Sequence, residues 1–273
     1  MYFITVSEML GTGGEEIARG VAETLHYSYC GEEELFRAAD EMGFLSDVKR
    51  LDEKGPHFFE RFFTEKPRVY LDRLQSLIYE LAKKGDAVFF GRGSQLLLHS
   101  FHCALHVLVT GSLQKRVERV IKEKGVGREI AEKMIRRSDH DKEGFIRYAF
   151  DEDWLNPNLY DLILNTDKLS IPSAIKSIVE SARSDEIKAC GVDSVKILGK
   201  LSLHRRIESA LLEAGFMPSR LFFEVEDEEW VRLYGVANSS EEKEEIERIV
   251  KGMKGVKRVT NDLIVMKAAM GGA

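Results

Sequence analysis

Residues 2–25, YFITVSEMLGTGGEEIARGVAETL, decide the fold of this chain. The short apolar and β-branched run at Tyr2–Val6 predicts a buried strand. A glycine-rich turn follows, and behind it Ile17, Val21 and Leu25 recur at the spacing of one helical face. A strand, a glycine turn and a helix in this order are typical of the opening of an α/β fold.

Further apolar segments alternate with helical ones up to about residue 182. The pattern predicts strands at 87–90, 105–109 and 160–165, and helices at 112–123, 128–148 and 170–182. Strands separated by helices imply a parallel sheet with helices on both faces. The segment 32–84 has a charged helical pattern with an aromatic cluster, for which we favour core packing over a ligand platform: Phe58, Phe59, Phe62 and Phe63.

The pattern changes near Ser184. It predicts a helix at 203–213, strands at 221–225 and 230–236, a helix at 240–253 and a strand at 256–265. Ser239 and Glu242 have the spacing of a capping box at the start of the second of these helices. We therefore predict two domains, residues 1–184 and a small α+β domain at 185–273.

Composition narrows the class of protein. The chain has 273 residues, 44% of them hydrophobic, and a formal net charge of -6, which excludes a disordered chain and argues against a nucleic-acid partner. Its three cysteines are few and widely spaced, so we expect no disulfide framework and a reducing compartment. The apolar runs are shorter than the roughly 20 residues of a membrane span, and we expect a cytoplasmic protein.

The turn Gly11-Thr12-Gly13-Gly14 lies between a strand and a helix, where backbone amides and the helix dipole favour an anion. A Walker loop adds a lysine for the outer phosphates and a hydroxyl for magnesium. Here Gly14 and Glu15 occupy those two positions, and Glu8 stands where the first loop glycine is expected. Taken alone, this motif fits a structural strand–helix turn about as well as a phosphate site.

The wider sequence resembles the cytidylate kinase-like family. The similarity begins with ITVSEMLGTGGEEIARGVAETL and continues through GDAVFFGRGSQLLL, VLVTGSLQKRVERVIKEKG, RRSDHDKEGFIRY and NLYDLILNTDKLSI, over about residues 1–182. The resemblance implies a P-loop kinase fold. It also implies transfer of a phosphoryl group from ATP, with Mg²⁺, to a CMP-like pyrimidine nucleotide.

The resemblance also implies roles for individual residues. The four loop residues Gly11 to Gly14 would hold the donor phosphates, and Arg92, in Gly91-Arg92-Gly93, would grip the acceptor phosphate. A basic lid would close over the phosphates and consist of Arg136, Arg137, Asp139, Lys142 and Arg147. Among these we expect Arg92, Arg136, Asp139 and Lys142 to be catalytic and Arg137 and Arg147 to bind nucleotide. The alternatives are a solvated helix face for the lid and a strand-end salt bridge for Arg92.

Several residues depart from the family pattern. Glu8 and Glu15 stand where the family has arginine, and Gln95 replaces an acidic residue after Gly-Arg. Carboxylates in a first helical turn stabilise its amides, so we expect Glu15 and Glu16 to occupy the anion site themselves. Donor nucleotide would then bind weakly or not at all. The alternative to a working kinase is therefore a catalytically degenerate nucleotide-sensing or scaffold protein.

A cluster of metal-ligand types occurs at His99, His102, Cys103 and His106. Because 105–109 is predicted to be a strand, those side chains would be scattered between two faces and a loop, so we expect no metal site.

The C-terminal segment resembles a BON domain in RIESALLEAGF, VRLYGVANS and GVKRVTNDLIV. This resemblance implies a non-catalytic binding module with a protein or lipid partner.

Overall fold

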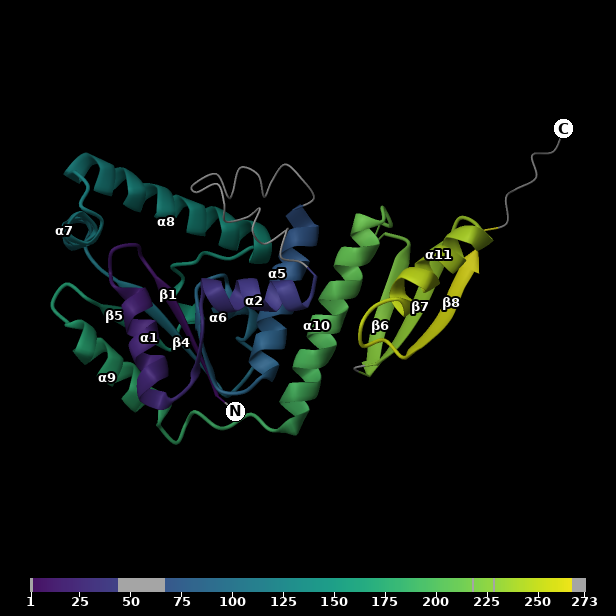
Figure 1. Cartoon of the computed structure of the whole chain (residues 1–273), viewed down its shortest axis with the longest axis horizontal. Helices are drawn as coiled ribbons and strands as arrows, with labels where there is room; N and C mark the ends of the chain where they lie inside the picture. The colour runs from purple at the N-terminus through teal and green to yellow at the C-terminus, as the bar shows by residue number, and fades with distance from the viewer. Residues whose placement is uncertain (1, 44–66, 218, 228, 267–273) are drawn as a thin grey trace. The chain divides into compact units, whose positions relative to one another are not determined.

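The computed structural model describes residues 2–43, 67–217, 219–227 and 229–266. The chain divides into two compact units (Figure 1). Unit 1 comprises residues 1–61 and 84–191, and unit 2 comprises residues 62–83 and 192–273. This division differs from the expected 1–184 and 185–273, because residues 62–83 group with the C-terminal part of the chain. The aromatic cluster predicted at 58–63 lies outside the described residues.

Unit 1 is built on a five-stranded parallel sheet of order β2-β3-β1-β4-β5. The strands are β1 (Phe3–Glu8), β2 (Ser28–Cys30), β3 (Ala87–Phe90), β4 (Ala104–Thr110) and β5 (Leu162–Asn165). The apolar runs predicted four of these strands. The short, partly exposed β2 has no such run and was not predicted.

Helices cover both faces of this sheet. They are α1 (Gly14–Leu25), α2 (Glu32–Glu41), α6 (Ser94–Leu97), α7 (Leu113–Lys124), α8 (Arg128–Phe150) and α9 (Ile171–Ala182), with a 3-10 turn, η2, at Pro157–Leu159. α1 and α9 lie side by side (Figure 1) and bury Ile17 and Ile178 in one core with Val6 of β1. Phe3 points to the other face, where it contacts Phe101 beyond α6 at a ring distance of 6.1 Å.

Unit 2 combines helices with a small sheet. Its elements are α5 (Pro67–Lys83), α10 (Val192–Glu213), β6 (Leu221–Asp227), β7 (Trp230–Ala237), α11 (Ser240–Lys251) and β8 (Arg258–Val265). β7 pairs with β6 in antiparallel and with β8 in parallel fashion. Leu203 of α10, Leu233 of β7 and Val250 of α11 are fully buried in one core. The predicted cap holds, since the Ser239 hydroxyl accepts a hydrogen bond from the backbone N–H of Glu242 at 3.1 Å.

α10 begins at Val192, well before the helix predicted at 203–213. α10 packs along α5, and two ion pairs join the helices: Arg73 to Glu213 at 2.6 Å and Arg205 to Asp72 at 3.2 Å. This pairing of helices explains why 62–83 belongs to unit 2.

The expectation of no disulfide is wrong. Cys103, just before β4, is bonded to Cys190, and 87 positions separate them in the sequence. Composition could not predict this pair, because only the fold brings the two positions together. Cys30 is a buried free cysteine. Across the described residues, none of the helices combines the length and apolar character needed to cross a bilayer.

Candidate functional site

The glycine loop joins the end of β1 to the start of α1 at the carboxyl edge of the sheet. Gly11 and Gly13 have φ values of +87° and +79°, a left-handed conformation that glycine adopts without steric cost. A Cβ atom at Gly13 would also lie 2.6 Å from the side chain of Ile171. The glycines are therefore required by the shape of this loop.

Three side chains hold the loop from outside. Arg116 Nε donates to the carbonyl oxygen of Leu10 at 2.8 Å. Thr166 Oγ1 donates to the carbonyl oxygen of Thr12 at 3.0 Å, and Arg119 donates to the same oxygen. These supporting side chains were not predicted from the sequence. Arg116 and Arg119 lie three residues apart in QKRVERV, which is the signal that would have placed them on one face of α7.

The side chain of Glu8 occupies the anion-binding position of the loop. The backbone N–H of Gly14, at the start of α1, donates to Glu8 Oε2 at 2.8 Å, and the hydroxyl of Thr12 donates to the same oxygen at 3.3 Å. An amide at a helix N-terminus is the donor that a phosphate group would use. The Glu8 carboxyl group thus takes the place of a bound anion in the loop.

The expectation that Glu15 and Glu16 occupy this position is wrong. Both side chains are exposed in the first turn of α1. Glu15 instead forms an ion pair with Arg19 at 2.9 Å, one turn further along the helix. The reason lies in the direction of the side chains. Those in the first turn of a helix point away from its axis, whereas Glu8, at the end of the strand, points across the loop.

Glu8 also explains why position 14 is a glycine. A Cβ atom on Gly14 would lie 2.5 Å from Glu8 Cβ and 2.8 Å from its Oε2. Any side chain at position 14, including the lysine of a Walker loop, would collide with Glu8. The glutamate at position 8 and the missing lysine at position 14 therefore have one structural cause.

Lys142, on α8, reaches the same loop. Its Nζ donates to the carbonyl oxygen of Glu8 at 2.5 Å and lies 5.7 Å from the centre of the Trp154 ring. Burial lowers the pKa of Lys142 while the Glu8 carboxylate raises it. Burial raises the pKa of Glu8, and the Lys142 charge opposes that shift. The ammonium and the carboxylate stabilise each other's charged form.

Asp139, one turn before Lys142, is engaged in an ion pair. Both of its carboxylate oxygens accept from one Arg116 nitrogen, Nη2, at 2.7 and 2.9 Å. The Arg116 side chain is only 3% exposed, so this pair is largely withdrawn from water. Asp139 therefore links α8 to α7 and, through Arg116, to the glycine loop.

Arg92 follows β3 at the same edge of the sheet. Gly91, Arg92 and Gly93 have φ values of +67°, +61° and +73°. For a non-glycine residue this conformation is strained, and such strain concentrates at functional sites. The N–H of Gly91 donates to the carbonyl oxygen of Val6 at 2.9 Å, which fixes the arginine turn beside the strand that ends in Glu8.

Three further arginines of the predicted lid lie on α8. Arg136 and Arg137 line a groove of about 520 Å³ together with Glu129, Glu132 and Lys133, all on α8. Arg147 is exposed and pairs with Glu143 at 3.0 Å. Within the predicted lid, Lys142 thus contacts the glycine loop directly, and Asp139 is linked to it through Arg116.

A buried polar chain lies next to Arg92. Gln95 Nε2 donates to the Tyr160 hydroxyl at 3.4 Å, and that hydroxyl donates to the carbonyl oxygen of Trp154 at 2.6 Å. Burial raises the pKa of Tyr160 to about 12. Because Trp154 also contacts Lys142, this chain connects the arginine turn with the glycine loop.

The residues weighed as metal ligands serve other purposes. Cys103 is in the disulfide, and the ring of His106 shares a 2.8 Å hydrogen bond with the Thr5 hydroxyl. Among the described residues, there is no group of three or more His, Cys, Asp or Glu that could hold a metal ion.

A parallel sheet of this order, with a glycine loop between its central strand and the following helix, defines a P-loop kinase-type domain. The profile of the cytidylate kinase-like family matches residues 3–168, and the chain belongs to that family. The BON domain profile matches residues 202–267 in unit 2.

Relatives with an assigned activity are distant. A cytidylate kinase from Methanothrix thermoacetophila is 28% identical over 60% of this chain and 88% of its own length. A cytidylate kinase from Pyrococcus horikoshii is 29% identical over 66% of this chain and 86% of its own length. A crystal structure of an uncharacterized protein from Eubacterium ventriosum covers 67% of this chain and 99% of its own, with a TM-score of 0.54 and 18% identity, and supports the fold alone.

The residues of the loop do not fit a bound ATP–Mg²⁺ as they stand. The Gly14 amide is already used by Glu8, position 14 has no lysine, and the hydroxyl position holds the exposed Glu15. A donor phosphate could enter only if the Glu8 side chain left the loop.

Proposed function

We propose that this chain is a nucleotide-binding member of its family in which Glu8 closes the phosphate-donor loop. It would bind a CMP-like nucleotide near Arg92 and would transfer phosphoryl groups from ATP far more slowly than a cytidylate kinase. The observation that carries this proposal is the hydrogen bond between the Glu8 carboxylate and the Gly14 amide. The nucleotide class rests on the family and on the cytidylate kinases it resembles.

Electrostatics supports a closed loop. Two like charges about 4 Å apart repel by about 4 kcal/mol near a protein surface. A triphosphate that enters beside the Glu8 carboxylate would meet this repulsion and would lose the Gly14 amide as a donor. Each 1.4 kcal/mol corresponds to about a tenfold change in affinity, so donor binding would be weakened by orders of magnitude.

The second candidate is an active kinase for a pyrimidine monophosphate, with ATP and Mg²⁺. Lys142 and Arg92 favour it, since one cation lies at the loop and the other beside it on the same sheet edge. Phosphoryl transfer depends mainly on such positioned cations.

Two measurements separate the candidates. Purified protein is incubated with Mg²⁺, ATP and CMP, dCMP or UMP, and the diphosphate product is quantified. The same ligands are tested for thermal stabilisation, because a ligand at 100 times its Kd stabilises the native state by about 2.7 kcal/mol. We expect CMP to raise Tm, ATP to leave it unchanged, and no product above background. Robust turnover of CMP would overturn the closed-loop proposal and establish the kinase.

We also propose a cytoplasmic location, since ATP and CMP are intracellular metabolites.

For the BON domain we propose an interaction role, with a protein or lipid partner. Sedimentation of the protein with anionic lipid vesicles tests the lipid partner. Protein that stays in the supernatant would leave a protein as the proposed partner.

A further inference from the structure

The Cys103–Cys190 disulfide ties the segment between α9 and α10 to the start of β4. Residues 183–191 follow α9 and lead into α10 at Val192. In the described part of the chain, the backbone hydrogen bonds donated by Arg183, Ser184 and Ile187 run only to residues 179–184, within the same turn. Ile187 adds partial packing against the core of unit 1. The disulfide is therefore a covalent link between this segment and the residue that precedes β4.

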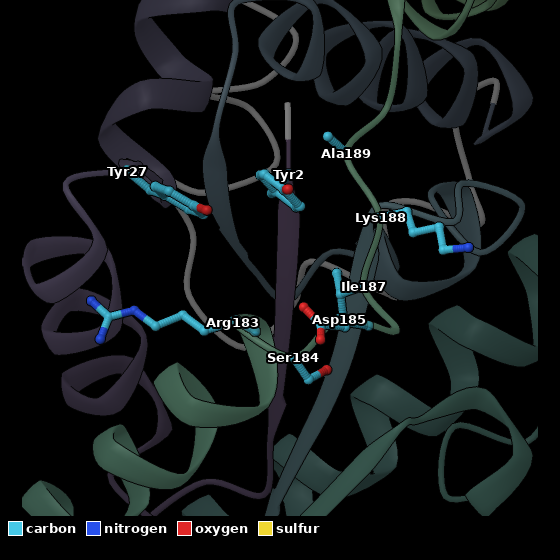
Figure 2. Close-up of a pocket in the computed structure, with 9 residues that line it drawn as sticks. Tyr2, Tyr27, Arg183, Ser184, Asp185, Ile187, Lys188 and Ala189 are labelled. Carbon is cyan, nitrogen blue, oxygen red and sulfur yellow. The ribbon is translucent and has the colours of Figure 1, made fainter.

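A pocket depends on the same segment. It measures about 450 Å³ and is lined on one side by Tyr2 and Tyr27 and on the other by residues 182–185 and 187–189. Figure 2 shows this segment running beside the start of β1, with the side chain of Lys188 directed away from the strand. If the segment moved, one whole wall of this pocket would move with it.

The two cysteines differ in exposure. Cys103 is 0% exposed, whereas Cys190 is partly exposed near the end of the segment. An incoming thiolate would thus reach Cys190 first. Disulfides of cytoplasmic proteins are usually transient, catalytic or redox-sensing, and the cytoplasmic location proposed above places this bond in that class.

We propose that Cys103–Cys190 is a redox-sensitive latch on the segment 183–191. A dithiol reductant opens it in two steps. Its thiolate attacks Cys190 Sγ, forms a mixed disulfide and releases the Cys103 thiolate, which takes up a proton. The second thiol of the reductant then displaces Cys190, so that two electrons and two protons convert the disulfide to two thiols while the reductant becomes a disulfide. Release of the latch frees the segment and dismantles the pocket wall.

The test combines thiol counting with limited proteolysis of the full chain. Protein purified without reductant is compared with protein treated with dithiothreitol. We expect denatured samples to contain one free thiol, from Cys30, before reduction and three after it. Lys188 is exposed and lies two residues before Cys190, so trypsin cleavage after Lys188 reports the freedom of the segment. Reduction should accelerate this cleavage by at least about tenfold, because cleavage follows the population of the open form.

Controls distinguish latch opening from unfolding. Cys190→Ser should be cleaved rapidly after Lys188 with or without reductant, while Cys30→Ser should respond to reductant as the wild type does. Cleavage after the exposed Lys124, elsewhere in unit 1, should not change on reduction. The proposal would be overturned if protein incubated with oxidised glutathione still contained three free thiols. It would also be overturned if reduction left the rate of cleavage after Lys188 unchanged. Equal acceleration at Lys124 would overturn it as well, because the bond would then be a general stabiliser.

Discussion

The side chain of Glu8 leaves room only for a glycine at position 14, on the other side of the loop. The sequence predicted that Glu15 and Glu16 occupy the anion site, whereas the structure places the Glu8 side chain there and pairs Glu15 with Arg19. The sequence could not tell which carboxylate points inward, since this depends on the pleat of β1 and on the direction of the first turn of α1.

Replacing Glu8 by glycine should open the loop. The variant removes both the like charge and the side chain that occupies the Gly14 amide, so we expect ATP affinity to rise by at least about tenfold. Isothermal titration with ATP and Mg²⁺ measures the change. Glu8→Gln, which keeps the volume without the charge, should gain less, and the exposed Glu16→Gln should gain nothing. Equal ATP affinity in Glu8→Gly and the wild type would contradict a closing role for Glu8.

His106 should make the stability of the protein depend on pH. Burial lowers its pKa from 6.5 to about 4, so the unfolded chain binds a proton between these values while the native protein does not. The contribution of the neutral ring is fully present above pH 6.5 and is lost as pH falls toward 4.

Between pH 7 and pH 5 this residue should therefore remove about 2 kcal/mol from the free energy of unfolding. Urea unfolding at the two pH values measures it, and His106→Gln should show a correspondingly smaller difference. Identical pH dependence in the two proteins would show that His106 does not titrate in this way.

The contact between helices α7 and α8 could not be inferred from the family resemblance. The similarity placed Asp139 in a catalytic lid, but the structure pairs it with Arg116, which supports the glycine loop. Sequence spacing puts residues on one helix face and gives no information about the neighbouring helix. The contact between Asp139 and Arg116, 23 positions apart, therefore required the fold.

Removing Asp139 should destabilise the protein more than removing a nearby carboxylate. Asp139→Ala leaves the buried Arg116 guanidinium without its partner, and breaking such a pair costs about 3 kcal/mol. Glu143→Ala removes an exposed ion pair with Arg147 on the same helix and should cost less than about 1 kcal/mol. Urea unfolding of the two variants gives the comparison. Equal stability of both would argue against a structural role for the Arg116–Asp139 pair.

Element prediction succeeded where the hydrophobic pattern was regular. The strand predicted at 87–90 has the bounds of β3, and the helix predicted at 170–182 begins one residue before α9. It failed at β2, which is three residues long, and at the first half of α10. Apolar residues in VKILGKL follow no single face, so the periodic signal that predicts an amphipathic helix is absent there.

At the level of the whole molecule, the sequence predicted two domains but could not predict which segments share a unit. The second unit includes α5, which lies more than 100 residues before α10. The disulfide is similar in kind, since it joins two positions that lie 87 residues apart in the sequence. Both are long-range pairings, which local patterns do not encode.

Because α5 belongs to unit 2, a truncated chain should show the effect of removing the other helices of that unit. A fragment of residues 1–191 contains α5 but lacks α10, the helix along which α5 packs. Leu74, Leu77 and Ile78 are buried in the full chain, and loss of a covering helix exposes side chains worth about 1.5–3 kcal/mol each. The fragment should therefore bind the dye ANS and melt at a lower temperature than the full chain. Addition of a separately purified fragment of residues 192–273 should suppress the dye signal, because it restores the partner of α5. A fragment 1–191 that melts at the temperature of the full chain, without dye binding, would instead place α5 in the first unit, as a division at residue 184 requires.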